Sequence, residues 1–179
     1  MRKLIITAGH NGAGTGASSL FIDEGKETIV LRDLLTIYLR NYGVTVKNDT
    51  DTESTSKVIS WVNQLFTPND ILIEIHFNSF SSWKPSGTES FVQSKHNSTE
   101  YQLAQSLCSV TSKVLNINNR GVKSPALSQH STIGILDKTK VNAVLYEVCF
   151  LSNKNDAERY QEKKKELVHE LSQAILLFL

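Results

Sequence analysis

Residues 4–18 read LIITAGHNGAGTGAS, and this stretch decides how the rest of the sequence is interpreted. Its apolar beginning, residues 4–8, is typical of a buried β-strand. The strand is followed by Gly9 and His10 and then by a run of small residues with almost no side chains. Ligands of α/β proteins bind outside the carboxyl ends of the strands, and small residues allow a loop to pass close to a ligand. The stretch therefore predicts that a binding site follows this strand.

The same glycines suggest two nucleotide-binding motifs, and the sequence favours neither. The segment GHNGAG has the outer glycine spacing of a P-loop, but Thr15 stands where that motif has its lysine. The segment GAGTGA matches the glycine pattern of a dinucleotide-binding fold, but residues 18–23 separate it from the next helix. We therefore expect no nucleotide site here.

The composition is that of an ordinary globular domain. The chain has 179 residues, 40% of them hydrophobic, and its 19 basic and 18 acidic residues give a net charge of +1. This balance indicates no surface for nucleic acid or for a membrane, and no apolar run reaches the roughly 18 residues of a membrane-spanning helix. Cys108 and Cys149 form neither a metal-binding pair nor a disulfide framework. We expect a monomer that binds neither nucleic acid nor membrane.

Strand and helix patterns alternate along the chain. We expect strands over residues 4–8, 44–48, 70–77, 88–93, 133–136 and 142–150. We expect helices over residues 24–42, 53–66, 97–115 and 155–178, and irregular loops over 78–87 and 118–132. Strands separated by helices predict an α/β fold: a single domain over residues 1–179, with a mostly parallel twisted sheet of about six strands and helices on both faces.

Three ionisable residues fall at the carboxyl ends of predicted strands, namely His10, His76 and Glu147. Strand alternation places Glu74 on the same face as His76, and Leu145 on the same face as Glu147. Each of the three alone has a structural interpretation, such as an exposed histidine or a buried ion pair. A buried carboxylate needs a partner or a metal, however, and zinc binds neutral imidazoles and carboxylates. The three residues together at one edge therefore suggest a zinc site.

The sequence resembles the zinc-dependent N-acetylmuramoyl-L-alanine amidases of the Amidase_3 type, which occur in bacterial autolysins and phage endolysins. The resemblance spans nearly the whole chain and rests on four blocks in the family's order. These blocks are ITAGH (6–10), DILIEIHFNS (70–79), NRGVK (119–123) and VLYEVCFLSN (144–153). The chain departs from the family where Thr-Ala replaces Asp-Pro before Gly9, and where Glu74 and Cys149 replace smaller residues. These departures concern the surroundings of the metal and the shape of the pocket.

The resemblance implies one zinc ion per chain, held by His10, His76 and a glutamate at the start of the first helix. Glu24 and Glu27 are both candidates for this third ligand. We favour Glu24, which lies at the mouth of the helix beside the glycine-rich loop, because the apolar stripe would place Glu27 on the packed face. That stripe consists of Val30, Leu31, Leu34 and Ile37.

The resemblance also implies an activity, in which Glu147 is the catalytic residue that transfers the proton of the attacking water. The bond joins the lactyl group of N-acetylmuramic acid to L-alanine of the stem peptide, so peptidoglycan is the expected substrate. Candidate substrate contacts are Asn78, Trp83 and Arg120. The alternatives are a zinc peptidase or amidase that acts on another peptide, and a cell-wall-binding module without activity. The retained Glu147 argues against the binding module.

The N-terminal segment MRKLIITAG reads as a first strand rather than as a signal peptide, because its apolar run is short. We therefore expect a cytoplasmic protein that reaches the cell wall when it is released by lysis or a holin, or by another export route.

Overall fold

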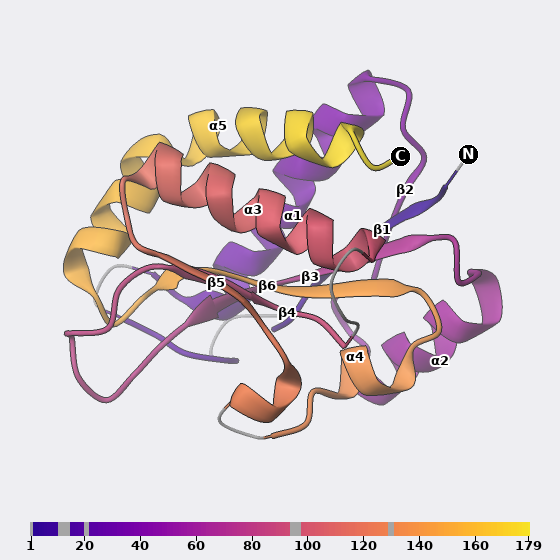
Figure 1. Cartoon of the computed structure of the whole chain (residues 1–179), viewed down its shortest axis with the longest axis horizontal. Helices are drawn as coiled ribbons and strands as arrows, with labels where there is room; N and C mark the ends of the chain where they lie inside the picture. Colours follow the sequence, from indigo (N-terminus) through magenta and orange to yellow (C-terminus); the bar gives the residue numbers. More distant parts are fainter. Residues whose placement is uncertain (1, 11–14, 20–21, 94–97, 129–130) are drawn as a thin grey trace.

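The computed structural model describes residues 2–10, 15–19, 22–93, 98–128 and 131–179, and it is built around one six-stranded sheet (Figure 1). The strands are β1 (Leu4–Ala8), β2 (Val46–Asn48), β3 (Ile71–Asn78), β4 (Thr88–Phe91), β5 (Asn119–Lys123) and β6 (Asn142–Phe150). Their order across the sheet is β2-β1-β3-β6-β4-β5. The expected count of six strands is confirmed, and β1 and β3, the strands of both predicted histidine blocks, lie side by side.

Helices cover both faces of the sheet, as predicted. The long helices α1 (Glu24–Asn41), α3 (Thr99–Leu115) and α5 (Lys154–Leu176) lie on one face, and the shorter α2 (Thr55–Leu65) and α4 (Gly134–Lys138) lie on the other (Figure 1). Successive side chains of a strand point to opposite faces of the sheet, so they pack into two separate cores, one on each face. In β1, for example, Leu4 and Ile6 belong to one core cluster and Ile5 to the other.

The directions of the strands explain why polar groups gather at one edge. Strands β2, β1, β3 and β6 are parallel, whereas β4 runs antiparallel to β6, and β5 runs parallel to β4. The sheet is therefore mostly parallel, as expected. The starts of β4 and β5 lie at the edge where the four parallel strands end. Residues at the ends of the parallel strands and residues at the starts of β4 and β5 therefore meet at this edge.

Two of the expected elements are wrong. Residues 133–136 were expected as a strand but lead into α4, because a run of four apolar residues fits either structure and here buries Ile135 and Leu136 beside α2. Residues 119–123 were expected to be irregular but form β5. This strand pairs with β4 alone and carries no fully buried side chain, so it lacks the apolar pattern that reveals a strand.

The other boundaries differ from expectation by a few residues, and residue 97, the expected start of the third helix, lies outside the described residues. Among the described residues, none of the helices has the length and apolar character that crossing a membrane requires.

Candidate active site

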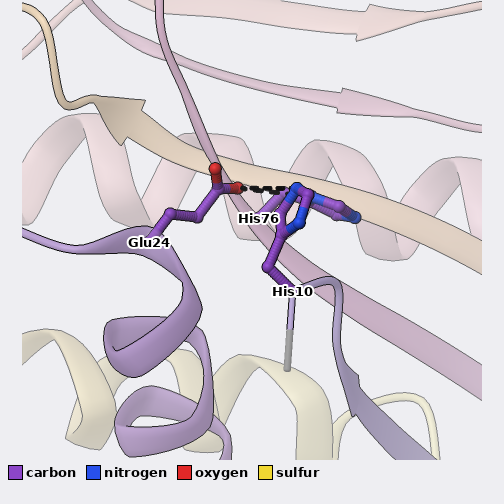
Figure 2. A group of neighbouring side chains, drawn as sticks. All are labelled: His10, Glu24 and His76. Carbon is purple, nitrogen blue, oxygen red and sulfur yellow. Dashed lines mark ion pairs between the residues drawn. The ribbon is translucent and has the colours of Figure 1, made fainter. Parts of the chain in front are cut away.

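The side chains of His10, Glu24 and His76 lie together at the edge where the parallel strands end (Figure 2). His10 follows β1, Glu24 is the first residue of α1, and His76 lies near the end of β3. The Oε1 atom of Glu24 is 3.4 Å from Nδ1 of His76 and 3.7 Å from Nε2 of His10. One ligand atom from each of the three residues lies within 4.8 Å of the other two, so the group could hold a metal ion.

Glu24 is fixed in place by the backbone around it. Its carboxylate accepts a hydrogen bond from the amide of Ala17 at 2.7 Å and another from the amide of Phe77 at 3.0 Å. Burial opposes the ionisation of this carboxyl group, but His76 and the two amides outweigh burial and lower its pKa. Glu24 is therefore a charged group that is already oriented towards the two histidines.

The two histidines differ in their electrostatic surroundings. Burial lowers the pKa of His10 below its ordinary value. Burial acts in the same direction on His76, but the carboxylates of Glu24 and Glu74 outweigh it and hold the pKa of His76 well above its ordinary value. In the metal-free protein His76 and Glu24 therefore form an ion pair, and a metal ion that binds His76 must displace a proton.

Two glycines of the opening stretch make room for this group. A Cβ atom on Gly9 would lie 2.0 Å from Nε2 of His76, and a Cβ atom on Gly16 would lie 2.6 Å from Oε2 of Glu24. Gly16 also has a positive φ of 73°, a conformation that side chains disfavour. Gly9 and Gly16 are therefore needed, because the imidazole and carboxylate groups occupy the space that their side chains would take.

Glu147 lies beside the same group, on the neighbouring strand. In the sheet it pairs with His76 of β3 on one side and with Glu89 of β4 on the other. Its Oε2 atom is buried and has no hydrogen-bond partner among the described residues. Burial raises the pKa of Glu147 to about 7, His76 opposes this shift, and the neighbouring carboxylates add to it. Glu147 is thus a carboxyl group able to take up and release a proton near neutral pH.

Glu89 is a fourth buried carboxylate at this edge, and the sequence analysis missed it. Its side chain accepts hydrogen bonds from Asn78 at 2.7 Å, from Arg120 at 2.6 Å and from Lys123 at 2.5 Å. Burial opposes its ionisation, but the two cations outweigh burial and lower its pKa. A signal was available, because strand alternation places Glu89 on the same face as the buried Phe91.

Glu27, the rival candidate for the third ligand, is engaged elsewhere. Its Oε1 atom accepts a hydrogen bond from the hydroxyl of Tyr160 at 2.8 Å and forms an ion pair with Lys164, both on α5. These contacts supply the partner that a carboxylate near the core requires.

The apolar stripe expected on α1 is half right, because Leu31 and Leu34 pack against the core but the other two residues do not. Val30 and Ile37 are 41% and 60% exposed, so they do not belong to the packed face. The buried face instead carries Glu24 together with Leu31, Leu35 and Leu39. Glu24 therefore lies in line with the packed residues, at the point where this face reaches the edge of the sheet.

The candidate residues surround a cleft with a volume of about 1040 Å3. The cleft is lined by His10, Glu24, His76 and Glu147, and also by Asn78 and Arg120. Trp83 is 73% exposed and is not among the described residues that line the cleft, although Lys84 and Pro85 beside it are. The structure therefore brings together six of the seven residues singled out from the sequence and leaves Trp83 outside.

Two histidines and a glutamate that gather where the strands of a mostly parallel α/β sheet end are an arrangement typical of metal-dependent hydrolases. The chain belongs to the N-acetylmuramoyl-L-alanine amidase family, Amidase_3, whose model matches residues 4–176.

Individual relatives agree with this assignment. An uncharacterized 38.4 kDa protein of Clostridium perfringens is 31% identical over 174 residues, which cover 93% of this chain and 48% of that protein. The N-acetylmuramoyl-L-alanine amidase CwlM of Bacillus licheniformis is 26% identical, over 89% of this chain and 60% of that protein. The catalytic domain of the CD27L endolysin targeting Clostridia Difficile has a TM-score of 0.80 and 25% identity, covering 98% of this chain and 97% of that chain. The chain spans about half the length of the first curated relatives that it matches.

Proposed function

We propose that this domain is a zinc-dependent amidase that cleaves peptidoglycan between the lactyl group of N-acetylmuramic acid and L-alanine of the stem peptide. The observation that carries the proposal is the His10–Glu24–His76 group beside Glu147, whose Oε2 atom is buried without a hydrogen-bond partner among the described residues. Family membership over residues 4–176 supports the choice of substrate and bond.

The donor set suits zinc. Two imidazole nitrogens and a carboxylate oxygen are ligands typical of catalytic zinc sites, which keep one position open. Ligand atoms around a tetrahedral zinc lie roughly 3.3 Å apart, similar to the 3.4 and 3.7 Å between Glu24 Oε1 and the two histidines. We propose that these three residues hold one zinc ion per chain. When bound, the ion would polarise the amide carbonyl and lower the pKa of water towards 7.

Glu147 is the proposed catalytic base and acid. It lines the cleft beside His76, and one oxygen of its carboxylate would accept the proton of the attacking water. The same oxygen then donates that proton to the nitrogen of L-alanine as the amide bond breaks. A carboxyl group is most effective in both steps when its pKa lies near the working pH.

Arg120 and Asn78 are the proposed substrate contacts inside the cleft. Glu89 accepts a hydrogen bond from each of them and so fixes their positions. Arg120 gives only its Nε to Glu89, and its guanidinium group lies 4.9 Å from the ring centre of Phe150. Its terminal nitrogens are then available for carbonyl or carboxylate groups of a stem peptide. Trp83, exposed beside the cleft, is the proposed contact for parts of the polymer that extend beyond it.

Digestion of purified peptidoglycan tests the proposed bond and the metal together. We expect mass spectrometry to find stem peptides with a new N-terminal L-alanine and glycan strands without new reducing ends. Exhaustive chelation should abolish this release, and added zinc should restore it.

Three outcomes would contradict the proposal. Cleavage inside the stem peptide would indicate a different peptidase, and wall binding without any cleavage would indicate a binding module. Full activity in protein that contains no detectable metal would refute the role of zinc.

A Gly9→Ala substitution should weaken zinc binding by about 10- to 100-fold, the range typical of disturbed groups around metal ligands. The added methyl group would overlap the ring of His76 and push it out of position. Zinc affinity can be measured by competition with a chromophoric chelator. Gly134→Ala is the matched control, because a Cβ atom there meets its nearest neighbour at 3.8 Å. Equal zinc affinity in the two variants would show that the position of His76 does not depend on Gly9.

A further inference from the structure

His76 lies between two carboxylates, and the proposed zinc site accounts for only one of them. Its Nδ1 atom is 3.4 Å from Oε1 of Glu24, on the side of the proposed metal ligands. Its other ring nitrogen, Nε2, is 3.4 Å from Oε2 of Glu74. Glu74 precedes His76 by two residues in β3, so both side chains leave the same face of the strand.

Glu74 lines the cleft and has a single side-chain partner among the described residues. Its side chain is buried, with the whole residue 7% exposed, and it forms no ion pair or hydrogen bond there except the one with His76. A buried carboxylate without a partner is unfavourable, and an apolar residue would fit the surrounding strand better. The contact with His76 is therefore what Glu74 contributes at this position.

We propose that Glu74 is a positioning residue that accepts the Nε2–H hydrogen bond of His76 and thereby leaves Nδ1 free to bind zinc. A neutral imidazole carries one proton, so a carboxylate beside one ring nitrogen determines which nitrogen is available as a ligand. Such a carboxylate also fixes the orientation of the ring and makes the ligand nitrogen more basic. This inference rests on the proposed zinc-dependent function.

The backbone around the ring supports the same geometry. Gly9 donates its amide hydrogen to the carbonyl of Ile75 at 2.8 Å, which holds the turn after β1 against β3. A Cβ atom on Gly9 would overlap the imidazole of His76, so the ring lies directly against this turn. The turn blocks movement of the ring on that side, and Glu74 and Glu24 bind its two nitrogens.

The inference is tested by Glu74→Gln, which keeps the size of the side chain but removes its charge. We expect the zinc dissociation constant, measured by chelator competition, to rise about 10- to 100-fold. The visible spectrum of the cobalt-substituted variant should match that of the wild type, since the number of ligands does not change. Glu27→Gln is the matched control, because it removes the charge of a carboxylate that contacts α5 instead of His76. Its zinc affinity should equal that of the wild type.

Nitrogen-15 NMR of the wild-type protein adds a measurement that does not depend on a variant folding. In the zinc-loaded wild type, the proton of His76 should reside on Nε2 and exchange slowly with solvent. In Glu74→Gln or Glu74→Ala this exchange should be faster, whereas a purely structural role for Glu74 would not change it.

The outcomes that would contradict this inference differ from those that would contradict the proposed function. Equal zinc affinity in the wild type and Glu74→Gln, or a proton on Nδ1, would overturn this inference and leave the amidase proposal intact. A cobalt spectrum that reports one ligand fewer in the variant would make Glu74 a ligand and would also overturn it. A wild-type protein that binds no zinc would overturn the proposed function and this inference together.

Discussion

Replacing Glu147 by glutamine should lower kcat by roughly 100-fold or more, because proton transfer by a positioned side chain contributes about that much or more. Glutamine has nearly the same shape, but it cannot accept the proton of the attacking water. Zinc should stay bound, since Glu147 is not one of the proposed ligands. The measurements are steady-state kinetics on a soluble muramoyl peptide and the zinc content of the purified variant. Loss of zinc in Glu147→Gln would make Glu147 a ligand, and unchanged kcat would leave the base unidentified.

The same substitution should stabilise the metal-free protein at neutral and higher pH. Burial raises the pKa of Glu147 from 4.5 to about 7, so the folded state holds this proton more tightly than the unfolded state. The stability that this proton provides is complete below pH 4.5 and is lost as the pH rises towards 7. Glutamine does not ionise, so the stability of Glu147→Gln relative to the wild type should rise from pH 4.5 upwards and reach a gain of about 3 kcal/mol above pH 7.

Thermal unfolding in the presence of a chelator measures this difference. The melting temperatures of the variant and the wild type should diverge as the pH rises. A difference that does not change with pH would show that the pKa of Glu147 is not raised in the folded, metal-free protein.

Substitution of Glu24 should lower the affinity for zinc more than any other substitution in α1. We expect Glu24→Ala to weaken zinc binding by more than about 100-fold, above the range for groups that only support a ligand. The carboxylate of Glu24 is the third member of the His10–Glu24–His76 group, and two backbone amides already hold it in position. Chelator competition measures the affinity, and circular dichroism shows whether the variant is folded.

Glu27→Ala is the companion variant, and it should change the stability of the fold without changing zinc binding. It should retain zinc but lower the melting temperature, because Tyr160 and Lys164 would lose their partner between α1 and α5. If Glu27→Ala loses zinc and Glu24→Ala keeps it, the assignment of the third ligand is wrong, although the amidase proposal survives.

The sequence predicts which ionisable side chains of the parallel strands lie together at this edge, because the signals for them are local. His10 follows one apolar strand pattern, and His76 and Glu147 lie near the ends of two others. Parallel strands that end at one edge bring such residues together. The alternation of side chains along β3 correctly placed Glu74 beside His76. These inferences need only the two-residue alternation of side chains along a strand and the rule that parallel strands end at the same edge of the sheet.

The rest of the site depends on information that is not local. The reversed direction of β4 carries Glu89 to the same edge, and nothing in the four residues of that strand indicates a direction. Arg120 was named as a candidate contact, but its strand β5 was not predicted, because the side chains of β5 are too exposed to show a strand pattern. On α1 the prediction placed Val30 and Ile37 on the packed face, but these apolar residues are exposed. Apolar residues are common on protein surfaces, so apolar character alone does not fix which side of a helix is packed.

The reversal of β4 and β5 has an evolutionary consequence. The three proposed metal ligands all come from residues 10–76, whereas Glu89 and the groups it holds come from residues 78–123. The segment that supplies the proposed ligands and the segment that supplies most of the opposite wall of the cleft thus follow one another in the sequence. Exchange of the segment between β3 and β6 by two crossovers would replace Glu89, Arg120 and Lys123 and would keep the proposed ligands and Glu147. Such an exchange would give the proposed amidase a different recognition surface without changing the residues proposed for catalysis.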